Sequence, residues 1–165
     1  MLQLIKTRRS IRKFTGQPVA DEMVEQIIEA GIWAPSGLNN QPWKVAVIRE
    51  PTAKNTIASL TRYSAIIQGA PVLLALFLDT SASYDRTKDV QAMGAFIQNM
   101  LLAIHAQGLG GVWLGEILKN KEMVSGIVNA PDAFELMAVI ALGHPAETGG
   151  RGSRKSVKDV VFYRG

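Results

Sequence analysis

The spacing of apolar residues along the chain predicts a mixture of helices and strands. In residues 21–34 (DEMVEQIIEAGIWA), Met23, Ile27 and Ala30 recur at the spacing of one helical face. Acidic residues open this segment and Pro35 follows it, so an amphipathic helix is expected to end just before the proline.

A second segment, residues 89–107, carries apolar residues around most of a helical circumference, which predicts a long buried helix. Asp89 is a candidate cap for its start, and Gly108 is a candidate for its end. Weaker helical patterns predict further helices at residues 3–9, 51–63 and 120–130.

Strands are expected where the pattern changes. Residues 43–50 alternate and are β-branched, and residues 71–79 form a continuous apolar run. That run fits a strand covered on both faces or a buried helix, and its length and leading proline favour the strand. Residues 134–143 and 157–165 are also expected to be strands. No strand is expected between residues 80 and 130, so helices and strands do not alternate regularly and the pattern predicts an α+β fold.

Composition narrows the possible classes. The 165 residues suggest one domain, 1–165, and a content of 47% hydrophobic and 19% charged residues excludes a disordered chain. The absence of cysteine excludes disulfides, thiolate nucleophiles, iron–sulfur clusters and cysteine-based zinc sites. The longest apolar run, residues 70–78, is too short to span a bilayer, and the basic start lacks a signal-peptide core. We therefore expect a soluble cytoplasmic protein.

The net charge of +4 is concentrated near the two ends of the chain. Arg8, Arg9, Arg12 and Lys13 form one cluster. The other cluster is Arg151, Arg154, Lys155 and Lys158. Three interpretations stay open: both clusters face one anion, they bind nucleic acid, or they are solvated tails.

Few side chains here can carry out chemistry by themselves. His105 and His144 are the only histidines and make no metal motif, and no serine or cysteine nucleophile motif is present. The segment GLGGVWLG (108–115) fails the dinucleotide fingerprint, because Trp113 stands where a glycine is needed. It fits a helix end with a tight turn equally well, although Gly115 would let a flat ligand approach the backbone. Basic clusters without a nucleophile or metal point to a phosphate-bearing aromatic cofactor.

Five segments in order resemble the nitroreductase family of FMN-dependent NAD(P)H oxidoreductases. They are RRSIRKF (8–14), APSGLNNQPWKV (34–45), DVQAMGAFIQNMLLAIHAQGLGGVWLG (89–115), ALGHPAE (141–147) and SRKSVKDVVFY (153–163). The resemblance covers nearly the whole chain. It implies a nitroreductase-like α+β fold with a mixed or antiparallel central sheet flanked by helices.

The resemblance also implies an activity and an assembly. NADH or NADPH would reduce FMN in a ping-pong cycle, and a nitroaromatic, quinone or similar acceptor would take the electrons. The protein would be an obligate homodimer with two FMN sites at its interface and a C-terminal strand that extends onto the partner subunit. The partners would be small molecules, with no nucleic acid and no membrane.

Position by position, the resemblance also implies the cofactor-binding residues. Arg12 would lie near the flavin N1–O2 edge, and a Leu114–Gly115 backbone N–H would point at N5. The lip residues Pro35, Ser36, Gly37 and Asn39 would meet the flavin of the other subunit. The complete set is Arg8, Arg9, Ser10, Arg12, Pro35, Ser36, Gly37, Asn39, Leu114, Gly115, Arg154 and Lys155, with Arg8 or Arg9 and the pair Arg154 and Lys155 at the phosphate. No catalytic side chain and no metal are expected, because FMN carries the chemistry.

Several positions depart from the pattern that the resemblance implies. Only the connector 80–88 occupies the place of inserted helices, so a compact member with an open pocket is expected. His144 stands where tyrosine is common, and Arg62 is a candidate mid-chain flavin contact. Two alternatives to the oxidoreductase stay open: a relative that fragments flavin or removes halogen reductively, and a non-catalytic module that binds flavin or nucleic acid.

Overall fold

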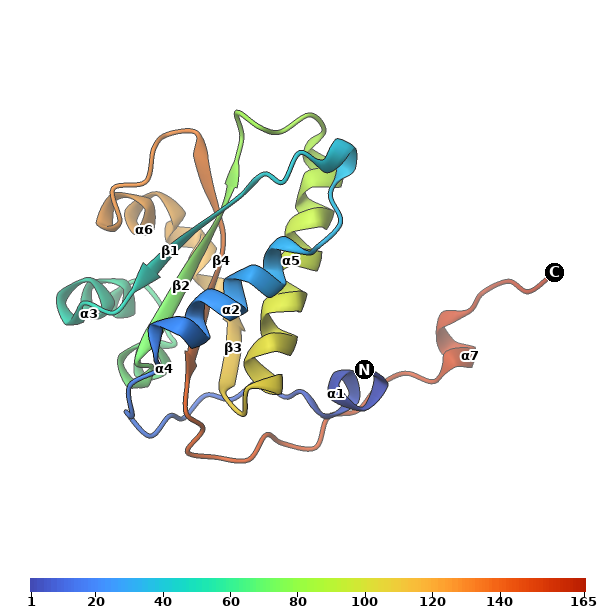
Figure 1. Ribbon diagram of the computed structural model, residues 1–165, viewed down its shortest axis with the longest axis horizontal. Helices are drawn as coiled ribbons and strands as arrows, with labels where there is room; N and C mark the ends of the chain where they lie inside the picture. Colours follow the sequence, from blue (N-terminus) through green and yellow to red (C-terminus); the bar gives the residue numbers. More distant parts are fainter.

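The computed structural model describes residues 1–165 and is built around a four-stranded antiparallel sheet with helices on both faces (Figure 1). The strand order is β1-β2-β4-β3. The strands are β1 (Trp43–Ile48), β2 (Val72–Asp79), β3 (Gly110–Leu114) and β4 (Phe134–Gly143).

Strand β2 is buried along its whole length, as its unbroken apolar sequence predicts. Leu74, Leu76 and Leu78 face the cluster formed with α2 (Asp21–Ile32) and α5 (Arg86–Ala106). The alternate residues of β2 face the opposite cluster, because successive side chains of a strand point to opposite faces. That cluster includes α3 (Pro51–Ser59), α4 (Ser64–Gly69) and α6 (Lys121–Ile127). The result is three layers, with the sheet in the middle.

The layer of α2 and α5 is held by close aromatic and glycine contacts. The rings of Trp43 and Phe96 stack with centroids 5.0 Å apart and an interplanar angle of 14°. Gly31 lets α2 approach α5, since a Cβ at this position would stand 2.7 Å from the Phe96 ring and 2.8 Å from Met100. Trp43 is therefore a core residue, as its place at the start of an apolar strand suggests.

Two helices differ in detail from the expectation. Helix α5 begins at Arg86 and is capped by Asp85, whose carboxylate accepts a hydrogen bond from the Lys88 N–H at 3.0 Å. The expected cap, Asp89, is instead wholly buried inside the first turns. Residues 51–63 were expected to form one helix, but α3 ends at Ser59 and the separate α4 follows. The end of α5 agrees with the prediction, because Gly108 has a φ of +74°.

The expectation of no strand between 80 and 130 is wrong, because β3 occupies the glycine-rich segment. Its glycines gave no strand signal, since glycine is rare in strands. The strand forms because Gly110–Leu114 pairs antiparallel with the end of β4. Glycine is needed at Gly110 because Ile11 leaves no room for a Cβ there, and Ile104 packs closely against Gly111. After β3 the chain continues through the short 3₁₀ helix η2 (Glu116–Asn120) into α6.

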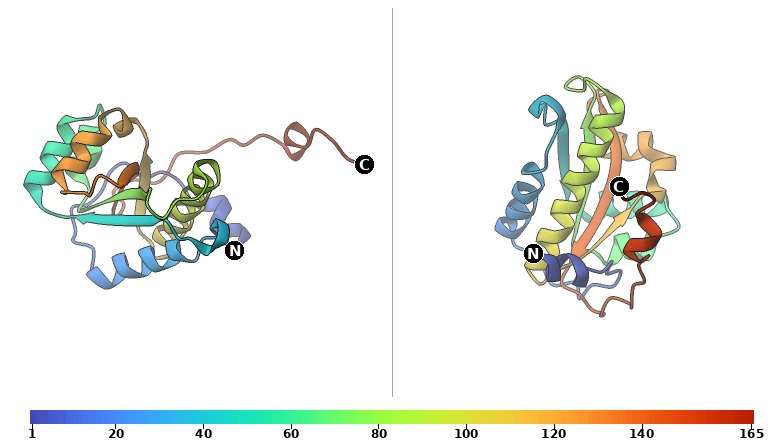
Figure 2. Two further views of the ribbon diagram at one scale, coloured as in Figure 1. Left: turned by 90° about the horizontal axis from the view of Figure 1, so that it is seen from above. Right: turned by 90° about the vertical axis from the view of Figure 1, so that its right-hand side faces the viewer.

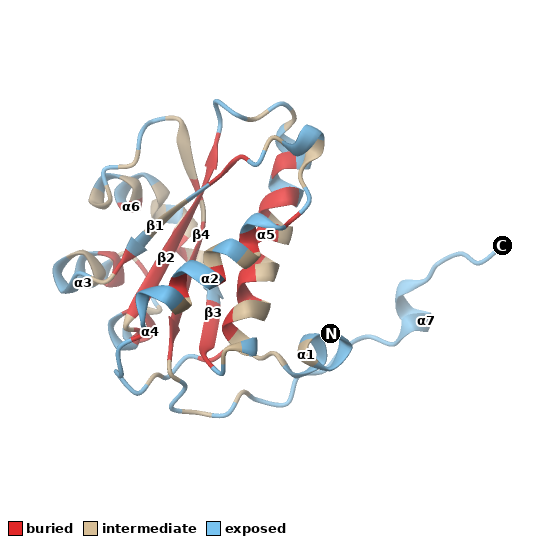
Figure 3. Ribbon diagram, in the orientation of Figure 1, coloured by how far each residue is buried: buried red, intermediate tan, exposed pale blue.

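The prediction of a C-terminal strand at residues 157–165 is also wrong for the single chain. Residues 151–165 are all exposed and form an arm that leaves the body of the molecule, as the left view of Figure 2 shows; Figure 3 shows their exposure. A strand cannot form without a neighbouring strand to share its hydrogen bonds. The arm instead carries one helical turn, α7 (Val157–Val160), closed by reciprocal hydrogen bonds between Ser156 and Asp159.

None of the helices has the length and apolar character that crossing a bilayer requires.

The remaining elements are α1 (Leu2–Thr7) at the N-terminus and the 3₁₀ turn η1 (Gly37–Asn39) between α2 and β1.

Candidate functional site

The segment that follows α1 runs along one end of the sheet. Ser10 forms a parallel bridge with Gly111 of β3, and the Ile11 N–H donates to the Gly111 carbonyl at 3.1 Å. Further along, Phe14 forms an antiparallel bridge with Pro145, beyond the end of β4. These contacts fix the backbone of the first basic cluster beside the start of β3.

The two basic clusters meet at this end of the sheet. Arg8 is partly buried, and its pKa is lowered by that burial and by the nearby guanidinium groups of Arg154 and Arg9. Arg9 donates to the carbonyl oxygens of Lys6 at 2.7 Å and Gly150 at 3.2 Å, which fixes its side chain against the base of the arm. No carboxylate forms an ion pair with any of these three arginines. Three converging cations without a counter-charge are suited to a phosphate group.

The other expected cations are arranged differently. The Arg12 N–H donates to Glu147 Oε1 at 2.8 Å, so Glu147 anchors the backbone while the Arg12 side chain stays exposed. Arg12 also lies at the edge of a hollow of about 510 Å³ beside α4. Lys155 lies on the exposed arm without a hydrogen bond or an ion pair. Glu147 was not identified from the sequence as a site residue, although it ends the motif ALGHPAE.

Leu114 and Gly115 lie at the far end of β3. Gly115 lies four positions after Gly111, which is about 13 Å along a strand. A Cβ added to Gly115 would meet nothing within 4 Å, so a flat group can approach the backbone there. The arginine cluster adjoins Ser10, which bridges Gly111, and the open backbone lies at the other end of β3. This arrangement suits a ligand with a phosphate at one end and a ring at the other.

Glu116, the residue after Gly115, links the segment around Thr61 to this site through a hydrogen bond. Glu116 accepts hydrogen bonds from Thr61 Oγ1 and from Lys119 Nζ, both at 2.5 Å. Lys119 and then Thr61 are the main causes that lower the Glu116 pKa, with a smaller contribution from the Arg62 charge. Arg62 itself donates to Tyr63 Oη at 3.1 Å. Thr61 and Glu116 were not identified from the sequence, where no motif marks them.

The lip residues Pro35, Ser36, Gly37 and Asn39 are not part of this cluster. The segment that carries them, residues 35–41, is called the lip below. These four residues surround η1, and the next residue, Asn40, is hydrogen-bonded to Asp89 near the start of α5. At the other end of α5, His105 contacts Thr7 of α1. Sixteen residues of helix separate those two contacts, or about 24 Å. Figure 1 shows η1 and α1 at opposite ends of α5. One chain therefore cannot bring the lip and the arginine cluster to the same small molecule.

Within the lip, backbone geometry explains part of the sequence. Leu38, Asn39 and Gln41 have φ values of 54°, 55° and 47°, in the left-handed region. Ser36 Oγ accepts a hydrogen bond from the Gln41 N–H at 3.1 Å.

His144 lies at the opposite end of the molecule from the lip. Its carbonyl oxygen accepts a hydrogen bond from the Thr15 N–H at 2.9 Å.

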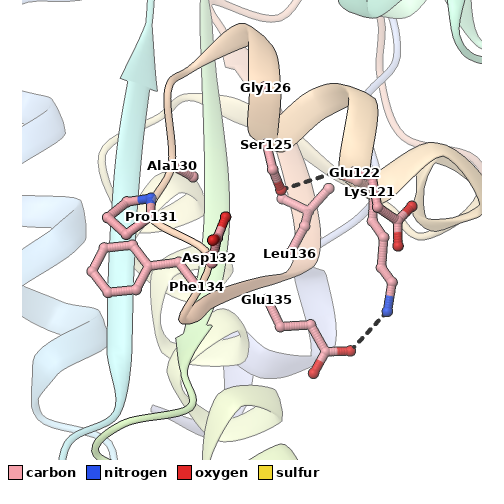
Figure 4. Close-up of a pocket in the computed structure, with 10 residues that line it drawn as sticks. All are labelled: Lys121, Glu122, Ser125, Gly126, Ala130, Pro131, Asp132, Phe134, Glu135 and Leu136. Atoms are coloured by element: carbon pink, nitrogen blue, oxygen red, sulfur yellow. Dashed lines mark hydrogen bonds and ion pairs between the residues drawn. The ribbon is translucent and has the colours of Figure 1, made fainter.

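A separate hollow of about 400 Å³ lies between α6 and the start of β4 (Figure 4). Its wall includes Lys121 and Glu135, whose Nζ and Oε1 atoms are 3.1 Å apart. It contains none of the expected cofactor-binding residues.

Comparison with known proteins identifies the family. The model of the nitroreductase family matches residues 5–62 and 50–144. The chain belongs to the nitroreductase family. A solved structure from Desulfovibrio desulfuricans, described as a nitroreductase in complex with FMN, superposes with a TM-score of 0.94 and 46% identity, over 99% of this chain and 96% of that one.

Two further relatives extend the comparison. A protein of Methanothermobacter thermautotrophicus named NADH dehydrogenase/NAD(P)H nitroreductase is 35% identical over 153 residues, which are 91% of this chain and 80% of that protein. The NADPH:FMN oxidoreductase of Vibrio harveyi in complex with NAD+ superposes with a TM-score of 0.90 at 26% identity, over 99% of this chain and 76% of that one. The nitroreductase-like α+β fold implied by the sequence motifs is thereby confirmed.

Proposed function

We propose that this nitroreductase-family protein is an FMN-dependent oxidoreductase that takes electrons from NADH or NADPH and passes them to a nitroaromatic, quinone or similar acceptor. The observation that carries the proposal is the convergence of Arg8, Arg9 and Arg154 without a counter-charge, close in sequence to Ser10, which bridges β3 at Gly111. The open backbone at Gly115 lies about 13 Å further along that strand. The family relatives include proteins described with FMN, NADPH and NAD+.

Bound FMN would accept hydride at its ring and release electrons to the second substrate. The protein's own part is to bind and to polarise. Arg8, Arg9 and Arg154 would hold the phosphate, and Arg12 would supply the positive charge that stabilises a reduced anionic ring at its N1–O2 edge. The backbone at Leu114 and Gly115 would contact the ring, and Ser10 and Lys155 would complete the phosphate end. In this proposal residues 1–165 form one FMN-binding domain.

The proposal includes a homodimer, for which the position of the lip is the main argument. Pro35, Ser36, Gly37 and Asn39 lie too far from the arginine cluster of their own chain to contact the same flavin. A second copy can bring its lip to that flavin, so each of the two sites takes residues from both subunits. Exposed apolar side chains near the lip support this arrangement, since Trp33 is 81% and Leu38 is 85% exposed.

The arm is the second argument for the dimer. Phe162 is fully exposed and Tyr163 is 75% exposed, which is unfavourable for a free chain end. Strand β1 is an edge strand whose outer hydrogen-bonding groups have no partner within the chain. We propose that the arm of each subunit lies on the other, where its last residues can become extended against a strand edge. We propose the cytoplasm as the location.

The visible spectrum of the purified protein tests the function. A yellow protein with a flavin spectrum that bleaches on anaerobic titration with NADH or NADPH is expected, and the titration ranks the two donors. A colourless protein that cannot be reconstituted with FMN would contradict the proposal. Recovery of intact FMN after many turnovers would exclude flavin fragmentation, and sedimentation of the FMN-loaded protein would give its oligomeric state.

A further inference from the structure

Asp89 is the one charged side chain of the chain with no exposed surface. It lies in the first turns of α5, one turn after the cap residue Asp85. Removing a carboxylate from water is costly unless hydrogen bonds replace its hydration. No ion pair of the structure includes Asp89. Its burial therefore depends on neutral donors, and their positions show what the carboxylate holds together.

Four donors converge on the two oxygens. Asn40 Nδ2 donates to Oδ1 at 2.7 Å, and Ser83 Oγ donates to Oδ2 at 2.6 Å. The N–H groups of Tyr84 and Asp85 also donate to Oδ2, at 3.1 Å and 3.2 Å. Burial alone would raise the Asp89 pKa, but the hydrogen bonds, from Ser83 and Asn40 first, lower it overall. The group is thus a buried carboxylate that stays ionised.

The donors come from two separate segments. Ser83, Tyr84 and Asp85 belong to the connector that joins β2 to α5. Asn40 belongs to the lip and uses its other N–H bond to donate to the Ala82 carbonyl at 3.1 Å. Its Oδ1 is buried without a partner, so the amide is oriented by its two donated bonds. Asp89 therefore fastens the lip to the connector and to the start of α5.

The lip needs such an anchor. Three of its non-glycine residues, Leu38, Asn39 and Gln41, have positive φ values, which persist only where the surroundings hold them. Leu38 and Asn39 are exposed, so core packing does not supply that support. Within the lip, the Gln41 N–H to Ser36 Oγ bond helps, but it does not tie the segment to the body of the protein. The bond from Asn40 to the buried carboxylate does.

We propose that Asp89 is a positioning residue for the cofactor site, acting through Asn40 to hold the lip in the conformation that meets the FMN of a second subunit. The inference rests on the proposed function. A buried carboxylate contributes little net stability compared with a well-packed apolar side chain. What it contributes here is a defined backbone geometry in a segment that adds almost nothing to the core. Asp89 touches neither substrate nor cofactor.

Two matched variants test this role. Asn40→Ala and Ser83→Ala each remove one side-chain donor from the same carboxylate, but only Asn40 belongs to the lip. The FMN-free proteins are titrated with FMN while flavin fluorescence is followed, and their thermal unfolding is recorded separately. Both variants should lower the melting temperature, Asn40→Ala at least as much as Ser83→Ala, because Asn40 also loses its bond to the Ala82 carbonyl. The FMN dissociation constant should rise about tenfold or more in Asn40→Ala, as for the loss of one hydrogen bond to a charged group. In Ser83→Ala it should stay within about twofold of wild type.

The outcomes separate this inference from the function on which it rests. Wild-type protein that binds FMN, together with equal dissociation constants for the two variants, would overturn the role of Asp89 alone. Wild-type protein that never binds FMN would overturn both. Asp89→Asn serves if Asn40→Ala does not fold. Its single oxygen has two lone pairs and can keep two of the three connector donors while its amide turns toward Asn40. Weaker FMN binding with the fold retained is again expected, and unchanged binding would contradict the proposal.

Discussion

The hydroxyl group of Tyr84 occupies the space in which a side chain at Gly37 would lie. A Cβ built on Gly37 overlaps Tyr84 Oη and would also stand 2.5 Å from its Cζ atom. Lys88 Nζ lies 5.2 Å from the centre of the same ring. Glycine at position 37 is therefore favoured by a contact within the chain, whether or not a flavin also approaches it.

This contact predicts the effect of a single added methyl group. Gly37→Ala should lower the free energy of unfolding by less than the roughly 1–3 kcal/mol that extra volume costs in a closed core, because the partly exposed Tyr84 ring can turn aside. Chemical denaturation of the FMN-free protein measures it. In a Tyr84→Ala background the same substitution should cost little, because the overlap is gone. An equal cost in both backgrounds would show that Tyr84 is not the cause.

The proposed role of Arg154 predicts that its removal weakens the binding of FMN only through the loss of a contact to the phosphate. Arg154→Ala should weaken FMN binding about 10- to 100-fold, the range expected for losing one hydrogen bond between charged groups. Riboflavin, which has no phosphate, should bind the variant and wild type equally. The FMN-free variant should be no less stable than wild type, because Arg154 repels Arg8 and lowers its pKa.

Lys158→Ala is the matched control for that experiment. Lys158 is also a cation of the arm, on α7, but it is not among the residues assigned to the phosphate. Its removal should leave FMN affinity unchanged at moderate salt. A similar loss in both variants would mean that the arm attracts FMN by net charge alone.

Asn39 lets the contribution of a side chain be separated from that of its backbone. Its φ of 55° favours glycine, so Asn39→Gly should leave the stability of the FMN-free protein nearly unchanged. Asn39→Ala should cost about 1–2 kcal/mol from backbone strain alone. If the amide contacts FMN, both variants lose FMN affinity, as measured by fluorescence titration. Full affinity in Asn39→Gly would reduce Asn39 to a turn residue.

The ion pairs around Glu135 predict a pH dependence of stability. Arg86 Nη1 lies 2.6 Å from Glu135 Oε2, and Lys121 binds the other oxygen. The Arg86 hydrogen bond lowers the Glu135 pKa most, burial opposes it, and Lys121 lowers it further. A carboxyl group with a lowered folded-state pKa stabilises the protein above its ordinary pKa, and this contribution is lost as pH falls through the lowered value.

Glu135→Gln should therefore be less stable than wild type at neutral pH, and the difference should shrink as the solution is acidified below the ordinary carboxyl pKa of about 4.3. Urea denaturation at a series of pH values measures it. Because the charged groups are partly exposed, added salt should also reduce the difference. A difference that stays constant from neutral to strongly acidic pH would contradict this origin.

Much of the fold follows from local pattern. The continuous apolar run of β2 predicts a strand buried on both faces, and its alternate residues do face two different helical layers. The spacing of Met23 and Ile27 likewise predicts α2, and Pro35 predicts its end. These elements were predictable because their signals lie within a few neighbouring residues.

Where the expectation failed, the cause was a distant partner or its absence. Strand β3 carries glycines that weaken any strand signal, and it exists because β4 pairs with it. Residues 157–165 carry a strand pattern but find no strand within the chain, so a capped helical turn forms instead. Neither cause can be read from the segment itself, because sheet hydrogen bonds join residues far apart in sequence.

The residue types of the site follow from local sequence: arginines at both ends, a polar glycine-containing lip and an open glycine after β3. Which of them meet depends on how the chain folds. It brings Arg8 to Arg154 across nearly the whole chain, and it places the lip at the other end of α5. It also buries Asp89, an expected helix cap, beneath that lip. The physical reason is that charge and backbone preference are local properties, whereas convergence and burial depend on how the sheet and helices pack.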